Sequence, residues 1–385
     1  MKYISLDQVC NIGMGQAPPG RSYNKSGEGI PLIAGAGDFG DTTPRTNKYT
    51  TAPTRISQPG DIILCIRATI GDTNWSDKQY CLGRGVAGLH PNPDLLDKNY
   101  LWHWLLSVKG LLVKSARGST FKQVSRDEIR ALPFPEISLP EQKRIAAILD
   151  KADAIRRKRQ QAIKFADEFL RSVFLDMFRP FKAWTVSIGE LLNKNILILH
   201  KDGNHGSLYP RTEDFGQNGI PFLSAKCLTN SGDIDGTLVQ RLKEEKANLL
   251  KIGWIEKGDV LLAHNATVGP VYLYSGQYEK AIIGTSLTAF RPNPRMLVSE
   301  FLVTALRSNF FQNQLNKLMK QTTRNQVPIT AQRNLKIQLF DFEKQIAFSL
   351  IFKTISGLVS KQLEQLELEE SFFNSLAQRA FRGEL

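Results

Sequence analysis

The residues best suited to chemistry in this chain are polar side chains in two glycine-rich loops, residues 11–31 and 200–221. Each loop combines cations, amides and a tyrosine. Arg and Lys hold phosphates or guanine edges, and Asn and Gln can bridge adenine edges, so these loops suit duplex DNA. A solvated surface loop with incidental charge is the alternative. The candidate DNA-binding residues are Gln16, Arg21, Tyr23, Lys201, Asn204, His205, Tyr209 and Arg211.

Further polar residues follow each loop at comparable positions. Arg67 and Asn265 each stand directly before an Ala-Thr pair. A common scaffold that carries different hydrogen-bonding groups could read two different base sequences. The remaining DNA-binding candidates are Arg84, Lys122, Gln123, Lys226, Arg324, Asn325 and Gln326.

Motifs for catalysis are missing from the sequence. GAGDFG at 35–40 has the letters of a dinucleotide fingerprint, but DTTPRTNKYTTAP follows it and cannot open the helix that the fingerprint needs. We interpret it as a glycine-rich loop. The sequence has no phosphate loop, no HExxH and no Asn/Asp-Pro-Pro-aromatic motif, and its five histidines lack metal spacing. We expect no catalytic residue, no metal and no cofactor in this chain.

The sequence segments that carry these residues occur twice in the chain. GDIILCIRATIGDTNWS begins at Gly60, and GDVLLAHNATVGPVYLYS begins at Gly258. His90-Pro-Asn-Pro returns as Arg291-Pro-Asn-Pro, at a similar offset of roughly 200 residues. The chain is therefore an internal duplication of one module.

Each copy ends in a long apolar stripe with steps of three and four residues, at 140–178 and 341–385, which is typical of a coiled coil. The first stripe is basic in its middle and the second is acidic. We expect antiparallel pairing, with Glu141 near Phe381. Arg156, Arg157 and Arg159 would then lie level with Glu364, Glu367 and Glu370. Two independent solvated helices are the alternative.

The composition is that of a basic protein, and the spacing of its cysteines favours free thiols. The 385 residues carry a formal net charge of +13, mostly in the two large segments. A basic balance permits nucleic-acid binding. Four cysteines lie far apart without zinc spacing, so we expect free thiols in a reducing cytoplasm. No run approaches 18 uncharged apolar residues and no secretion signal is evident, so we expect no membrane partner.

Several segments together resemble the specificity subunit of type I restriction-modification systems. They are PGDIILCIRATIGDTNW with YCLGRGVAGL, LPEQKRIAAIL from Leu139 and AFRGEL from Ala380, and the likeness covers essentially the whole chain. The second copy departs from the pattern at His264-Asn-Ala-Thr and at Gly284-Thr-Ser. Residue roles are therefore harder to transfer into that copy.

The resemblance implies two α/β (α+β) target-recognition domains in a pseudo-two-fold arrangement, separated by two long antiparallel coiled-coil helices. The segments would be 1–139 and 181–340 for the domains, and 140–180 and 341–385 for the helices. Each domain would read one half of a bipartite double-stranded DNA site, and the helices would fix the gap. Two methyltransferase subunits that carry S-adenosylmethionine would dock here, and motor-nuclease subunits could join. The alternatives are the recognition subunit of a methyltransferase-only system and a protein-binding coiled-coil scaffold.

Overall fold

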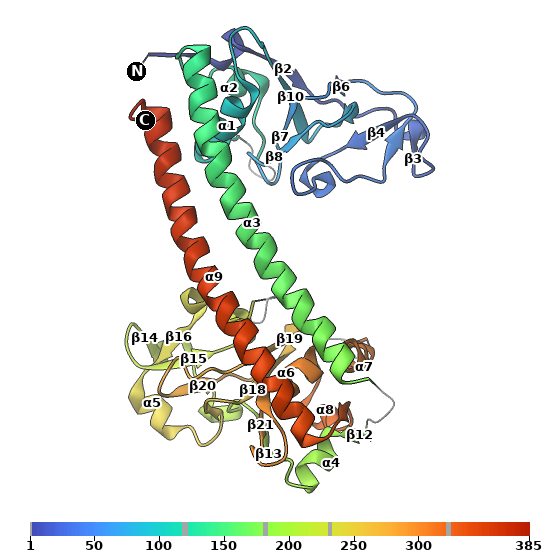
Figure 1. Ribbon diagram of the computed structural model, residues 1–385, viewed down its shortest axis with the longest axis vertical. Helices are drawn as coiled ribbons and strands as arrows, with labels where there is room; N and C mark the ends of the chain where they lie inside the picture. The colour runs from blue at the N-terminus through green and yellow to red at the C-terminus, as the bar shows by residue number, and fades with distance from the viewer. Residues whose placement is uncertain (1, 118–121, 180–183, 230–232, 321–324) are drawn as a thin grey trace. The chain divides into compact units, whose positions relative to one another are not determined.

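The computed structural model describes residues 2–117, 122–179, 184–229, 233–320 and 325–385 (Figure 1). It divides into two compact units, the first of residues 1–161 with 362–385 and the second of residues 162–361. The division runs through both long helices, α3 (Leu139–Met177) and α9 (Phe342–Arg382). Each unit therefore contains one copy of the duplicated module and a part of both long helices.

The described residues of the first unit's module form three sheets and two α-helices. An antiparallel four-stranded sheet has the order β2-β10-β7-β8, and a five-stranded sheet has the order β3-β5-β4-β9-β6, in which β4 and β9 are parallel. The elements are β1 (Tyr3–Ser5), β2 (Cys10–Met14), β3 (Tyr23–Asn24), β4 (Ile30–Ile33), β5 (Tyr49–Thr50), β6 (Ile56–Ser57), β7 (Ile62–Cys65), β8 (Thr73–Trp75), β9 (Tyr80–Leu82), β10 (Val86–Pro91), α1 (Lys98–Ser115), α2 (Arg126–Arg130) and β11 (Pro133–Pro135), with β1 paired to β11.

The second unit repeats this topology. Its four-stranded sheet is β13-β21-β18-β19, its five-stranded sheet is β14-β16-β15-β20-β17, and β12 pairs with β22. The elements are β12 (Trp184–Ser187), α4 (Ile188–Asn193), β13 (Leu197–Asp202), β14 (Phe215–Gly216), β15 (Ile220–Leu223), β16 (Gln240–Leu242), α5 (Glu244–Leu249), β17 (Trp254–Ile255), β18 (Val260–Asn265), β19 (Thr267–Leu273), β20 (Ala281–Ile283), β21 (Leu287–Pro292), α6 (Ser299–Arg307), α7 (Asn309–Met319), α8 (Ile329–Gln332) and β22 (Lys336–Leu339). The duplication and the α/β fold class are confirmed.

A buried glutamine fixes the start of each long helix to its module. In α3, the Gln142 Oε1 atom accepts the Asp97 N–H at 2.9 Å, while Nε2 donates to the Ile137 carbonyl at 3.1 Å. In α9, Gln345 makes the matching contacts with the Val298 N–H and the Phe340 carbonyl. Both side chains are almost fully buried, so breaking these bonds would strand backbone polar groups in the core.

Each module completes its core with the helix of the other copy. In the first unit the core includes Phe373, Ala377 and Phe381 of α9, and the Phe381 ring lies 5.3 Å from the Tyr100 ring. In the second unit the core includes Leu170 and Phe174 of α3 and Phe178 directly after it, and the Phe178 ring lies 4.9 Å from the Phe301 ring of α6. Each of the two cores thus contains residues from both halves of the chain, and we call this arrangement the exchanged core.

The two helices are antiparallel within the first unit, as the sequence predicts. Arg144 donates to the Leu385 carbonyl at 3.0 Å, whereas Arg159, further along α3, forms a bidentate pair with Glu369 at 2.7 and 2.8 Å. Arg159 also donates to the Gln362 side chain. Residues further along α3 therefore contact residues that come earlier in the C-terminal segment, so the two helices run in opposite directions.

In the described part of the chain, only one of the three arginines expected level with the acidic segment of α9 pairs with it. Arg156 and Arg157 both pair with Asp153 of their own helix, at 2.6 and 2.5 Å. Arg159 bridges to Glu369, and among the described residues no ion pair joins these arginines to Glu364, Glu367 or Glu370. Asp153 lies three and four residues before the two arginines, on the same helix face, so a pre-positioned local partner takes both charges.

The length and composition of α9 alone would allow it to cross a membrane, which the sequence analysis did not anticipate. Four phenylalanines of this helix pack against the modules, although other large side chains such as Leu350, Leu368 and Phe372 are exposed. Phe348 and Phe352 lie in the core of the second unit, and Phe373 and Phe381 lie in that of the first. The core helix of a soluble protein can have the same length and composition, so these two properties are weak evidence for a membrane span.

The exchanged core predicts an effect at long sequence distance. We expect Phe381→Ala to destabilise the first unit by about 3 kcal/mol, because a buried aromatic ring is lost. Hydrogen exchange should accelerate in α1, which Phe381 contacts through Tyr100, and not in β18 or β21. Phe372→Ala, at a neighbouring helix position that is 63% exposed, is the control and should leave α1 protected. Equal exchange in the two variants would contradict the exchanged core.

Candidate nucleic-acid interface

A strained turn occupies the same position in both modules. Ala68 has φ of 57° and Ala266 has φ of 64°, both in the left-handed region that disfavours residues with a Cβ atom. Each such residue costs roughly 1–2 kcal/mol. Backbone strain of this kind clusters at functional sites. The turn follows β7 in the first module and β18 in the second, and it sets the direction of the preceding residues, Arg67 and Asn265.

In the first module the structure brings Arg67 and Gln123 together. The Arg67 Nε atom donates to Gln123 Oε1 at 2.8 Å, and the two backbones form a β-bridge. This bond orients the guanidinium and leaves its two terminal nitrogens without a hydrogen bond to any described residue. Paired N–H donors of this kind match the O6 and N7 acceptors of guanine or two phosphate oxygens.

In the second module the equivalent group is Asn265 with the segment from Asn325. Asn265 forms a β-bridge with Gln326, and the Ala266 N–H donates to the Asn325 carbonyl at 2.9 Å. The Asn265 carboxamide has no hydrogen bond within the described part of the chain. A carboxamide presents one donor and one acceptor, which suit the N7 and N6 positions of adenine. Arg324, also predicted here, lies outside the described residues.

The other predicted residues are mostly exposed, in keeping with an external ligand. Arg84 precedes Gly85, whose carbonyl accepts the Ile66 N–H at 2.9 Å, so it lies beside the Arg67 turn. Asn204 differs from the others, because it is buried and donates to the Ile252 carbonyl. This amide maintains the loop and is not available to a ligand. The exposed candidates not yet placed are Gln16, Arg21, Tyr23, Lys122, Lys201, His205, Tyr209, Arg211 and Lys226.

The glycine-rich GAGDFG segment has a structural role. Asp38 accepts the Ala34 N–H at 2.8 Å and pairs with Lys48 at 3.0 Å. No α-helix follows it before β5, and these residues are all described. The expectation that no helix opens directly after this segment is confirmed. In addition, no cluster of three His, Cys, Asp or Glu residues suited to a metal ion occurs among the described residues.

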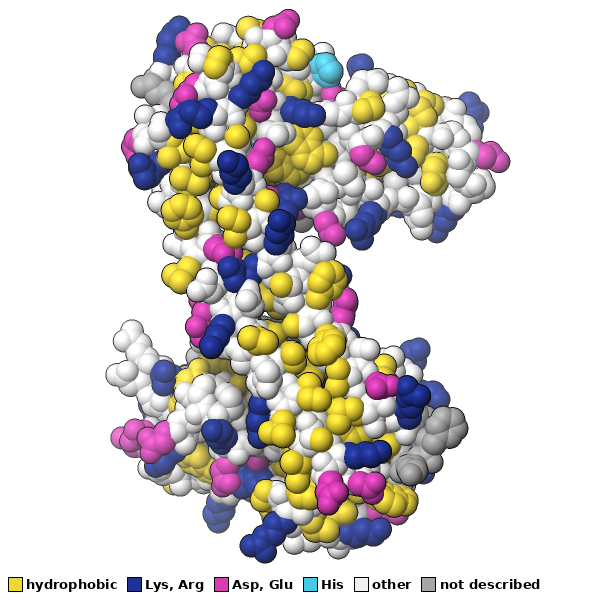
Figure 2. Space-filling model, viewed as in Figure 1, with side chains coloured by type: hydrophobic (Ala, Val, Ile, Leu, Met, Phe, Trp, Pro, Cys, Tyr) yellow, Lys and Arg dark blue, Asp and Glu magenta, His cyan; other side chains and the backbone are white. Residues whose placement is uncertain are grey.

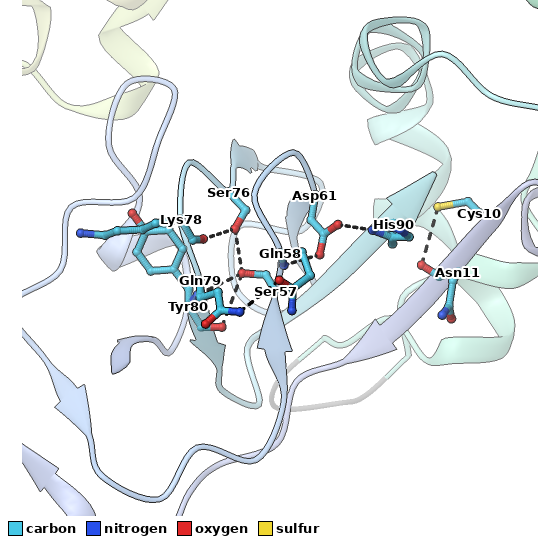
Figure 3. A network of polar contacts seen from close by, with 10 residues as sticks. All are labelled: Cys10, Asn11, Ser57, Gln58, Asp61, Ser76, Lys78, Gln79, Tyr80 and His90. Carbon is cyan, nitrogen blue, oxygen red and sulfur yellow. Dashed lines mark hydrogen bonds and ion pairs between the residues drawn. The ribbon is translucent and has the colours of Figure 1, made fainter. Parts of the chain in front are cut away.

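A network of polar contacts lies at the start of β7, the strand that leads to Arg67 (Figure 3). Asp61 accepts the Gln58 N–H at 2.8 Å and contacts His90 Nδ1 at 2.6 Å, while the hydroxyls of Ser57 and Ser76 lie 2.8 Å apart. In the second module, Asp259 takes the place of Asp61 and holds Arg291 through two bonds of 2.8 Å. The sequence signal for this support was the Gly-Asp pair that opens both copies of the strand.

The second module contains two buried histidines near its turn, His200 and His264. Burial lowers the pKa of both side chains to about 4. Both rings are therefore neutral at pH 7. No role for either residue was predicted from the sequence.

These pKa values predict a pH dependence of the second module. Between pH 6.5 and 4 the unfolded chain takes up protons on these rings and the folded chain does not, so folding stability is complete above pH 6.5 and decreases as the pH falls. We expect the ring C–H resonances of His200 and His264 to titrate with midpoints near 4. Assignment can use His200→Gln and His264→Gln spectra. Midpoints near the ordinary value would contradict the burial of the two rings.

Comparison with known proteins gives a consistent result. The family model described as the type I restriction modification DNA specificity domain matches residues 1–164 and again residues 185–368. A protein of Methanocaldococcus jannaschii carries the name of the type I restriction enzyme MjaX specificity subunit. It is 33% identical to this chain over 175 residues, which are 45% of this chain and 41% of that protein. The MjaVIII specificity subunit of the same organism is 24% identical over 330 residues, 81% of this chain and 76% of the relative.

Solved structures agree at the level of the fold. The S subunit of a type I restriction-modification system from M. genitalium has a TM-score of 0.60 at 16% identity, covering 99% of this chain and 96% of that one. A chain from a study of complex assembly in a type I R-M system has a TM-score of 0.52 at 18% identity, covering 100% and 98%.

Proposed function

The chain belongs to the family of type I restriction-modification DNA specificity subunits, and we propose that each of its modules reads one half of a bipartite site in double-stranded DNA. The observation that carries this proposal is the pair of equivalent strained turns with different reading groups, Arg67 with Gln123 and Asn265 with Gln326. One scaffold thus presents a donor pair in one module and a carboxamide in the other. A recognition subunit of a methyltransferase-only system would use the same two sites.

The chemistry of reading follows from these groups. A bidentate contact of Arg67 with guanine, or of Asn265 with adenine, would contribute about 1–3 kcal/mol of discrimination. Exposed cations such as Arg21, Lys201 and Arg211 would hold phosphates, so affinity should fall steeply as salt rises. The burial of Asn204 removes it from the set of base-reading residues.

The long helices would set the gap between the two half-sites. Their 39 and 41 residues correspond to about 58 and 62 Å of helix. The Arg159–Glu369 pair lies on the seam of the helices and would fix their register, as single polar seam residues do in coiled coils.

The subunit would have no catalytic activity of its own and would act within a larger complex. Two methyltransferase subunits would supply S-adenosylmethionine chemistry, and motor-nuclease subunits would supply cleavage. Exposed apolar side chains on both helices support such docking (Figure 2), and they include Phe165, Phe169, Leu350, Leu368 and Phe372. Four buried free cysteines agree with a reducing cytoplasm.

Selection from a random duplex-DNA library tests this function. The chain, co-purified with its genetically adjacent methyltransferase, should enrich two short sequence blocks around a fixed unspecified gap. Arg67→Ala should broaden the preference in one block, and Asn265→Ala in the other, by about 1–3 kcal/mol each at the base affected. Arg382→Ala, an exposed cation at the end of α9, is the matched control and should leave both blocks unchanged. A failure to enrich any sequence at low salt would favour a protein-binding scaffold.

Shortening both helices tests the spacing role. We expect deletion of residues 163–169 together with 355–361, one heptad from each helix, to shorten the gap by about three base pairs, since seven residues span about 10 Å. Arg159, Gln362 and Glu369 remain in place. Affinity should fall because the half-sites also rotate about the DNA axis, but the bases preferred in each block should stay the same. A change in those bases would argue against helices that act only as a spacer.

A further inference from the structure

A continuous chain of buried hydrogen bonds lies inside the second module. The His200 ring contacts Gln332 Oε1 at 3.2 Å, the Gln332 Nε2 atom donates to Thr288 Oγ1 at 3.1 Å, and Thr288 Oγ1 lies 2.8 Å from His264 Nδ1. Thr288 and Gln332 are fully buried, and His264 and His200 are 1% and 3% exposed. These four residues, His200, His264, Thr288 and Gln332, are called the polar chain below.

One arrangement of protons satisfies every bond. His200 donates from Nε2 to the Gln332 oxygen, and the Gln332 amide donates one hydrogen to Thr288 and the other to the Val327 carbonyl at 3.0 Å. The Thr288 hydroxyl then donates to the unprotonated Nδ1 atom of His264. Both rings are neutral in this arrangement. The His200 Nδ1 atom is buried without a hydrogen-bond partner among the described residues. The bonds between the four side chains are all paired, and buried hydrogen-bond networks rigidify a core and select one packing of it.

The first module holds apolar residues at all four equivalent positions. Strand register and matched backbone bonds align His200 with Ile12, Thr288 with Ala87 and His264 with Ile66. The bond from Val124 N to the Ile66 carbonyl corresponds to the bond from Val327 N to the His264 carbonyl, which aligns Gln332 with Ile129. All four apolar residues belong to the core of the first unit. The same fold therefore forms without the polar chain.

The polar chain ends at the proposed base-reading group. His264 is the residue before Asn265, and its carbonyl accepts the Val327 N–H at 2.8 Å. Gln332 holds the Val327 carbonyl. Val327 in turn follows Gln326, which forms the β-bridge with Asn265. The polar chain thus clamps both backbone segments that carry the reading groups of this module.

We propose that the polar chain is a positioning device that determines the base specificity of the second module, by fixing the backbones of Asn265 and Gln326. The proposal rests on the DNA-reading function proposed above. The first module orients its reading group differently, through the side-chain bond between Arg67 and Gln123. Removal of the polar chain should therefore relax one half-site and leave the other as it is.

Two matched variants separate the hydroxyl group from the shape of its side chain. Thr288→Val keeps the shape and leaves one hydrogen of the Gln332 amide and His264 Nδ1 unpaired, while Thr288→Ser keeps the hydroxyl. In the library selection with the co-purified methyltransferase, we expect Thr288→Val to reduce discrimination in the second module's block about tenfold, and Thr288→Ser to match the unmodified chain. The first module's block should stay the same in both variants, as an internal control.

A fourfold variant tests the whole polar chain. H200I/H264I/T288A/Q332I installs the apolar set of the first module, and we expect it to fold with an unfolding midpoint at least as high as that of the unmodified chain. Its second block should lose preference while its first block is retained.

The outcomes distinguish the two proposals. If the unmodified chain gives no split motif, the DNA-reading function itself fails. If it gives a split motif and both Thr288→Val and the folded fourfold variant retain the second block, the positioning role is overturned. A fourfold variant that does not fold leaves the decision with the Thr288→Val and Thr288→Ser pair. Equal loss in both blocks would also overturn the proposal, because it would show a general loss of binding.

Discussion

The exchange of helix segments between the two copies is the constraint on which the rest of the structure depends. Neither module closes its core alone, since α9 provides Phe373 and Phe381 to the first unit and α3 provides Leu170 and Phe174 to the second. Buried aromatic side chains contribute several kcal/mol each, a large part of the stability of a single domain. Each helix must therefore form along its whole length for either module to be complete. The buried Gln142 and Gln345 reinforce this requirement, because they join the first turn of each helix to the module that precedes it.

The two copies of the module share some residues and differ at others, and the two groups have different roles. Positions that support the shared scaffold keep their chemistry in both copies, as Asp61 and Asp259 do at the start of the central strand. The strained alanines also remain, since a left-handed residue directs the end of that strand. The side chains directly before these alanines differ between the copies, since Arg67 in one copy is replaced by Asn265 in the other. Duplication thus separates the parts that fold from the parts that read.

Much of this architecture could be predicted from the sequence, because repeats and periodicity report on equivalent elements and on buried faces. The duplication, the antiparallel helices and the rejection of GAGDFG all follow from local pattern. The partner of Arg159 could not be predicted, since Asp153 competes for the neighbouring arginines at helical spacing. Asn204 looked like a surface amide because its acceptor, the Ile252 carbonyl, is distant in sequence. The polar chain could not be predicted for the same reason. Its members lie on four elements between residues 200 and 332, so they are distant in sequence.

The two modules also show why different reading groups need rigidity in different places. An arginine has a long side chain with many rotamers, so a partner at the side chain itself, Gln123, removes the most freedom at the site of contact. An asparagine is short, and the position of its carboxamide is set almost entirely by the backbone that bears it. Rigidity must then come from beneath the turn, which is where His264, Gln332 and Thr288 are hydrogen-bonded. The apolar residues at these positions in the first module indicate that a polar core is not needed for folding, so its presence under the shorter reading group is consistent with a role in placing that group.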